Sequence, residues 1–292
     1  MWLGWILASC GVLSLYDLCK KASVRENAVF PCLLGSALSG WTAVTVWLMM
    51  RGQLAATVCV SGATACLLLV KSVIVGASWT ATYMALKSLP ITCAAPIRAT
   101  GPFWTLAGAV FLFAEWPTPA QAVGMALTLA GCFLFSLSAR YEGIDILHSR
   151  AVALALLGTV LGSASALYDK HLLRARQLPT ATVLWWFLGG MAVIYMSVVL
   201  AARFRAGHGK FEFRWTIPCV GLLLAASDAC YFNAVGAEGA QISVLSMIRR
   251  SSVVLTFILG GAVFRETNLR RKALALATIL AGVFLLCLAA RR

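Results

Sequence analysis

The sequence predicts an all-α polytopic membrane protein with ten transmembrane helices, and three observations support this fold class. Of the 292 residues, 61% are apolar and only 12% are charged, whereas soluble domains average about 45–50% apolar and about 25% charged. A soluble fold could not bury so much apolar surface. The apolar runs are continuous rather than alternating, which disfavours a β-barrel. Composition therefore excludes a soluble enzyme, a disordered protein and a nucleic-acid-binding module.

Ten apolar segments follow one another along the chain, each about long enough for one crossing of the bilayer. Pro90, Pro117, Pro119 and Pro179 lie at or beside the ends of segments, where helices are expected to begin or end. The third segment belongs to a longer apolar stretch, 54–86, so its start stays open. The ten expected helices are 2–19, 28–50, 60–86, 91–113, 119–139, 150–169, 180–202, 215–237, 240–263 and 272–290.

The second half of the sequence repeats the first at an offset of 151 or 152 residues. The matched positions are Leu15-Tyr16-Asp17 with Leu167-Tyr168-Asp169, Ile97-Arg98 with Ile248-Arg249, Glu115 with Glu266, and Leu129–Leu134 with Leu280–Leu285. Charged and Tyr-Asp matches in one register are not expected by chance in apolar helices. We therefore expect two five-helix repeats, 1–146 and 147–292, which form one integral transport unit.

Five helices per repeat have a geometric consequence. The second repeat enters the membrane from the side opposite to the first, so a pseudo-two-fold axis in the membrane plane relates the two. Inverted repeats of this kind are typical of secondary transporters, because one fold can then adopt two mirror-related states.

Each repeat has an Arg within its fourth helix, a Glu at the far end of that helix, and a fifth helix with the pattern Leu-Ala-Gly-x-Phe-Leu. In these features the chain resembles the EamA family of the drug/metabolite transporter (DMT) superfamily over essentially its whole length. The resemblance implies two inverted repeats around a central cavity, which the third, fourth, eighth and ninth helices line. It also implies export of a metabolite, with amino acids, nucleosides, sugars and organic cations all represented in the family.

The net charge of +14 comes from basic residues spread over many short connections, so no nucleic-acid partner is expected. Connections after odd-numbered helices carry fourteen Lys and Arg residues, whereas the other connections and the two ends carry six. This bias predicts a multi-pass protein of the inner membrane with both termini outside. No Lys or Arg precedes the first apolar run, so we expect a retained helix rather than a cleaved signal peptide.

Six ionisable residues lie deep enough in the expected helices to be costly in lipid unless they are paired or hydrated. They are Asp17, Lys71, Arg98, Asp228, Arg249 and Arg250. Four are basic, which favours a substrate with a negative group, because the Arg fork matches carboxylate or phosphate. Asp228 either neutralises Arg249 or Lys71, or carries a coupling proton or binds a substrate amine. A pocket with both Asp and Arg would suit a zwitterion such as an amino acid.

Neighbouring polar and aromatic residues are expected to complete the substrate site. Tyr231 follows Asp228 at i+3, with Asn233 near the adjoining helix face, and Tyr83 follows Trp79 at i+4. The expected substrate-binding residues are Trp79, Tyr83, Arg98, Asp228, Tyr231, Asn233, Arg249 and Arg250.

A second group of residues is expected to act in gating or structure. The Tyr-Asp pairs are read either as gates or as interfacial anchors, with Asp169 near a helix end. Glu115 and Glu266 end their helices and are expected to cap paired helix ends at the contact between the repeats. The group consists of Tyr16, Asp17, Lys71, Glu115, Tyr168, Asp169 and Glu266.

No catalytic residue, metal site or cofactor is expected. The sequence has no nucleotide-binding loop, its three histidines lie in expected turns, and its ten cysteines include no Cys-x-x-Cys pair. The expected function is secondary or facilitative transport of a small amino-acid-like or anionic metabolite, by a monomer or homodimer with or without a coupling proton. The alternative is a flippase for a lipid-linked sugar or phosphate, while an intramembrane enzyme and a scaffold are disfavoured.

Overall fold

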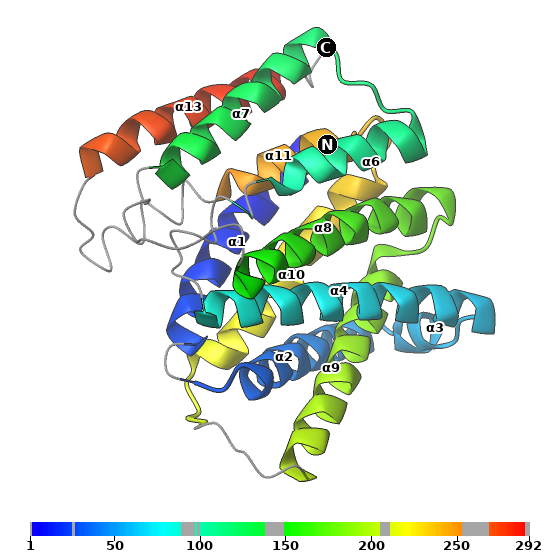
Figure 1. Cartoon of the computed structure of the whole chain (residues 1–292). Helices are drawn as coiled ribbons and strands as arrows, with labels where there is room; N and C mark the ends of the chain where they lie inside the picture. Colours follow the sequence, from blue (N-terminus) through cyan, green and yellow to red (C-terminus); the bar gives the residue numbers. More distant parts are fainter. Residues whose placement is uncertain are drawn as a thin grey trace.

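The computed structural model describes residues 2–24, 27–88, 97, 100–137, 149–204, 211–252 and 269–289, and in these ranges the protein consists of helices and the short connections between them (Figure 1). Two short elements, α3 (Leu54–Val58) and the π-helical turn η1 (His171–Ala175), accompany the longer helices. The longer helices are α1 (Trp2–Val24), α2 (Val29–Met50), α4 (Gly62–Ser88), α6 (Gly101–Phe113), α7 (Pro119–Leu137), α8 (Arg150–Lys170), α9 (Thr180–Phe204), α10 (Thr216–Gly236), α11 (Ile242–Arg250) and α13 (Leu269–Ala289).

Six of the described helices are long and apolar enough to cross a membrane: α1, α2, α4, α9, α10, and α8 together with η1. Large apolar side chains also face outward, with Met50 76%, Phe111 88% and Phe284 66% exposed. Apolar surface on the outside is costly in water and favourable in lipid. The prediction of an all-helical fold is thus confirmed for the described residues, and the six apolar helices are consistent with a membrane protein.

Helix boundaries differ from those expected from sequence at several places; α1, for example, ends at Val24 instead of residue 19. The backbone of Cys59 leaves the helical region at ψ 83°, so α3 ends there and α4 begins at Gly62. The sixth expected helix does not end at residue 169, because η1 extends it to Ala175. In this turn the Arg176 N–H donates to the carbonyl of His171, 3.0 Å away and five residues back. The extension places Asp169 inside a continuous helical rod instead of at its end.

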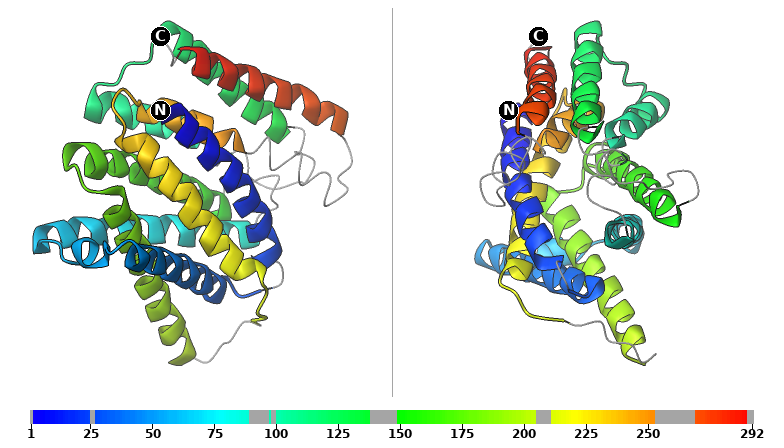
Figure 2. Two further views of the ribbon diagram at one scale, coloured as in Figure 1. Left: turned by 180° about the vertical axis from the view of Figure 1, so that it is seen from behind. Right: turned by 60° about the vertical axis from the view of Figure 1, so that its left-hand side comes forward.

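The helices pack mainly as pairs that are distant in sequence. α1 lies along α10, α4 along α8, and α7 along α13. α2 and α9 contact each other, while α2 also packs on α10 and α9 on α4. Figures 1 and 2 show the α7–α13 pair at one end of the molecule and α2, α3 and α9 at the other.

The crossing of α2 and α10 brings two backbones nearly into contact. A Cβ atom on Gly221 would lie 2.0 Å from the carbonyl oxygen of Ser36, and one on Gly40 would lie 2.8 Å from that of Gly221. The Ser36 hydroxyl donates across the crossing to the carbonyl of Ile217, at 3.2 Å. Small residues and interhelical hydrogen bonds hold helices together in lipid, where no hydrophobic force drives them to associate.

Substitution of Gly221 should therefore open this crossing. We expect Gly221→Ala to lower the free energy of unfolding by about 1–3 kcal/mol, the usual cost of overpacking. Gly11→Ala is the matched control, because nothing lies within 4 Å of a Cβ atom there. Thermal unfolding of both variants in one detergent measures the difference. Equal unfolding temperatures would show that α2 and α10 are free to move apart.

Candidate functional site

A cavity of about 330 Å³ lies among seven helices near the middle of the molecule. α4, α6, α10 and α11, which correspond to the third, fourth, eighth and ninth expected helices, all contribute to its lining. α1, α8 and α9 line it as well, and α8 supplies Gly158, Gly162, Ser163 and Asp169 among others. The site is therefore shared by helices from both ends of the chain.

Asp228 and Arg249 form an ion pair on the cavity wall, with Arg249 Nη2 2.5 Å from Asp228 Oδ1. Their side chains are 10% and 20% exposed. Arg249 is the penultimate residue of α11, where the negative end of the helix dipole favours a cation. Its guanidinium also lies 4.2 Å from the ring centroid of Tyr231. Its Nε atom is buried and has no hydrogen-bond partner among the described residues.

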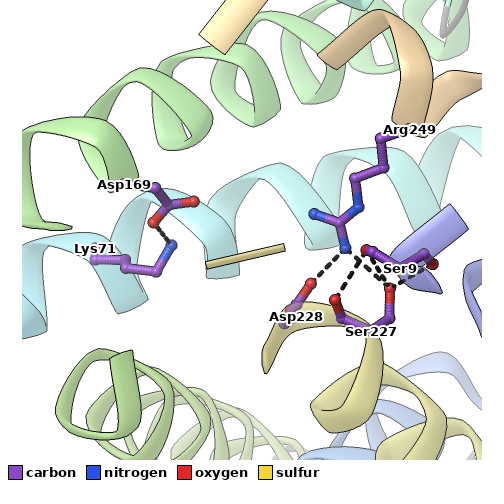
Figure 3. A network of polar contacts seen from close by, with 6 residues as sticks. All are labelled: Ser9, Lys71, Asp169, Ser227, Asp228 and Arg249. Carbon is purple, nitrogen blue, oxygen red and sulfur yellow. Dashed lines mark hydrogen bonds and ion pairs between the residues drawn. The ribbon is translucent and has the colours of Figure 1, made fainter. Parts of the chain in front are cut away.

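This ion pair is anchored to α1 through two serines. The Ser9 hydroxyl donates to the carbonyl of Ser227 at 2.8 Å, and the Ser227 hydroxyl donates to the carbonyl of Ser9 at 3.1 Å. Arg249 Nη2 lies 3.4 Å from the Ser227 hydroxyl. α1, α10 and α11 thus meet at one polar contact (Figure 3).

Lys71 and Asp169 form a second ion pair, between α4 and α8 (Figure 3). Their side chains are only 2% and 5% exposed. The Lys71 ammonium also lies 4.9 Å from the ring centroid of Phe187 and 5.0 Å from that of Phe232. A cation over aromatic faces gains electrostatic stabilisation that is strongest where water is excluded. Burial of this lysine is thus compensated by one carboxylate and two rings.

Glu115 joins three helices outside the cavity. It pairs with Lys170 of α8, and its Oε2 atom accepts a hydrogen bond from the Ile242 N–H at 3.1 Å. Ile242 is the first residue of α11, so the carboxylate satisfies a free backbone donor at the positive end of that helix. Ala114, with φ 51°, ends α6 in the left-handed conformation and turns Glu115 toward these partners.

The charges that line the described part of the cavity are balanced. Asp17, Asp169 and Asp228 face Lys20, Lys71 and Arg249, three against three. The sequence analysis found an excess of deep basic residues partly because it placed Asp169 near a helix end and did not count it. Since α8 continues into η1, Asp169 lies within the helical rod and adds to the acidic residues. Among the described lining residues, acidic and basic side chains are therefore equal in number.

Most of the residues expected to act together do meet. Trp79, Tyr83, Asp228, Tyr231 and Arg249 line one cavity, as expected for substrate-binding residues. The lining also includes four residues that were expected in gating or structural roles: Tyr16, Asp17, Lys71 and Asp169.

Other expected residues lie elsewhere. Asn233 is not among the described lining residues of the cavity. It is exposed and donates to the Ala229 carbonyl at 2.8 Å, because five residues along the helix from Asp228 turn it about 140° away. The Tyr168 hydroxyl donates to the Leu67 carbonyl at 3.1 Å, outside the lining. Three expected residues fall outside the description: Arg98 and Glu266 entirely, and Arg250 in its side chain.

Sequence reasoning missed the hydroxyl groups of the cavity and the lysine of α1. These residues are Lys20, Ser78, Thr82, Thr105, Thr159, Ser163, Ser165, Ser246 and Ser252. A signal for some of them was present in the glycines of α8. A Cβ on Gly158 would lie 2.4 Å from Thr82 Oγ1, and the Ser78 hydroxyl donates to the Gly158 carbonyl at 2.7 Å. Close packing of α8 on α4 therefore brings these hydroxyl-bearing residues to the cavity.

The comparison with known proteins shows the fold but no family. No family model and no curated protein matches the sequence. Solved structures do match, 29 chains in all. One of them, a crystal structure of a protein, is similar with a TM-score of 0.77 and 17% sequence identity over 99% of this chain and 96% of that one. At this identity the similarity shows a shared fold alone.

The Asp228–Arg249 pair should be energetically coupled. We expect Asp228→Leu and Arg249→Met each to lower the free energy of unfolding by about 3–5 kcal/mol, because each leaves a buried charge without its partner. The double variant should cost clearly less than the sum of the two. Thermal unfolding of the four proteins completes the cycle.

Glu212 provides the control for this cycle, because it pairs with Arg214 at 3.2 Å while its side chain is 73% exposed. Glu212→Gln should change the free energy of unfolding by less than about 1 kcal/mol. Strictly additive effects of the Asp228 and Arg249 substitutions would contradict a coupled ion pair.

Proposed function

We propose that this protein is a secondary or facilitative transporter of the EamA type, which moves a small zwitterionic, amino-acid-like metabolite across the inner membrane by alternating access. One observation carries the proposal. A cavity inside a bundle of membrane-length helices is lined by two ion pairs, and so by both acidic and basic side chains. The charge bias of the connections supports an orientation with both termini outside.

The packing of the helices supports two inverted five-helix repeats, 1–146 and 147–292. Exchange of equivalent helices between the repeats turns the α1–α10 contact into the α8–α4 contact. The same exchange turns α2–α10 into α9–α4, and it maps the α2–α9 and α7–α13 contacts onto themselves. Such a pattern is expected of two homologous repeats around a two-fold axis.

The lining of the cavity supports a substrate with both a carboxylate and an ammonium group. Arg249 is the more exposed member of its pair, so its guanidinium can receive a carboxylate. Asp17 lines the same cavity, and its carboxylate forms no ion pair with a described residue. It can therefore receive an ammonium group. Trp79 and Tyr83 also line the cavity, where their rings can pack against the substrate side chain.

Balanced charges also account for how such a substrate can leave water. A zwitterion carries no net charge, so it leaves the net charge of a balanced cavity unchanged. Each of its charged groups nevertheless loses water, at a cost that only a specific partner offsets. A simple anion would instead add an unmatched charge to a site of low dielectric.

A ligand screen tests the proposal. Purified protein is heated with an α-amino acid, its deaminated acid, its decarboxylated amine, a nucleoside and a sugar phosphate, because a bound ligand raises the unfolding temperature. We expect a shift with the amino acid only. Arg249→Gln should weaken that ligand at least about tenfold, or about 1.4 kcal/mol, through loss of a charge-assisted hydrogen bond.

Arg51 supplies the control, because it is exposed at the end of α2 beside Trp47. Arg51→Gln should bind the amino acid like the wild type. An equal shift with the deaminated acid, or a shift with the amine alone, would contradict the zwitterion. A shift with a lipid-linked sugar phosphate and no amino acid would favour a flippase instead.

A further inference from the structure

Lys71 and Asp169 are the ion pair of the cavity most completely removed from water. Their side chains are 2% and 5% exposed, against 20% and 10% for Arg249 and Asp228. The Lys71 ammonium also lies over the rings of Phe187 and Phe232. Because the two ring faces remain when the carboxylate loses its charge, the ammonium keeps part of its stabilisation.

The two ion pairs of the cavity differ in proton chemistry. The guanidinium of Arg249 holds its protons at every physiological pH, so it keeps a fixed positive charge beside Asp228. In the Lys71–Asp169 pair the acidic partner is a carboxylate held by a lysine that lies over two aromatic rings, with no guanidinium of a described residue bonded to it. Figure 3 shows the two pairs in the same region of the molecule. Of the two ion pairs of the cavity, Asp228–Arg249 therefore contains a fixed positive charge, whereas Lys71–Asp169 is the pair that can exchange a proton.

We propose that the Lys71–Asp169 pair binds a coupling proton, and that transport by this protein is proton-coupled. The proton forms an O–H bond on the Asp169 carboxylate, which becomes neutral. The ion pair with Lys71 then breaks, while Lys71 keeps its own protons and its positive charge. This inference rests on the proposed transport function, and it assigns the proton to Asp169 instead of Asp228.

Protonation of Asp169 affects the contact between the two proposed repeats. Lys71 lies on α4 and Asp169 on α8, and these helices pack along each other. While the pair is intact, moving α4 away from α8 separates two opposite charges on buried side chains. Once Asp169 is neutral, this attraction is absent. Proton binding therefore favours the conformation in which α4 and α8 move apart and water reaches Lys71.

The other ionisable groups of this region are less suited to the role. Those that line the cavity are Tyr16, Asp17 and Lys20 on α1, Tyr83 on α4, Asp228 and Tyr231 on α10, and Arg249 on α11. Asp17 is only half-buried, and it forms no ion pair with a described residue that would link α1 to another helix. The two residues that follow Asp169 have other partners, since Lys170 pairs with Glu115 and His171 stacks on Tyr168. α6 and α9 contribute Thr105 and Phe187, which do not titrate.

Infrared difference spectroscopy of the purified full-length protein tests the assignment without any substrate. A protonated aspartic acid gives a carboxyl C=O stretching band that the carboxylate lacks. We expect this band to develop reversibly in the wild type as the pH is lowered, while circular dichroism shows a folded protein. Asp169→Asn should lose the band, and Asp228→Asn should keep it.

The double variant Lys71→Met/Asp169→Asn guards against misfolding, because it removes both charges together and leaves neither unpaired. It should fold and lack the band. A band that persists in this variant, is lost in Asp228→Asn, or develops only as the protein unfolds would overturn the proposal. Failure of the ligand screen would leave this spectroscopic result unaffected, so the two proposals fail separately.

Discussion

The cost of an unpaired charge in an apolar surrounding is the constraint on which this structure depends. Within the described residues, three ion pairs link different helical segments: Lys71 with Asp169, Glu115 with Lys170, and Asp228 with Arg249. Two of them lie between the proposed repeats, and both use neighbouring residues at the end of α8. A shift of α8 by one residue along its axis would disturb both pairs at once. The charges thus fix the register of α8 against α4 and against α6.

Small residues provide the complementary constraint, because helices in lipid gain little from hydrophobic burial and must pack closely. Gly221 allows α10 to contact the backbone of α2, and Gly158 allows α8 to contact Ser78 and Thr82 of α4. Gly282 likewise allows α13 to pack closely on α7, because a Cβ atom on it would lie 2.4 Å from Thr128 Oγ1. The small side chains that permit close packing of α8 also leave room for the cavity along its inner face.

The sequence predicted the class of fold and much of the site, but not the partners of the charges. Composition and apolar runs were sufficient for the helices, since α2 (Val29–Met50) was expected at 28–50. Whether Asp228 pairs with Arg249 or Lys71 stayed open, because helical periodicity gives the face of a residue and not the neighbour it meets. Asp169 was placed near a helix end because no residue pattern predicts the π-helical turn η1. The burial of Asp169 results from tertiary packing, which leaves no local pattern in the sequence.

The proposed repeats share several charged positions but differ at two deep ones, and this difference bears on function. Under an offset of 151 residues, Lys71 corresponds to Leu222 and Asp228 corresponds to Ala77, so neither deep charge has a counterpart. Two repeats with identical charges would give two mirror-related conformations of equal energy. Placing a lysine in one repeat and an aspartate in the other makes these conformations inequivalent. A ligand or proton that alters one ion pair then has a different effect on each state, and only such a difference can shift the equilibrium between them.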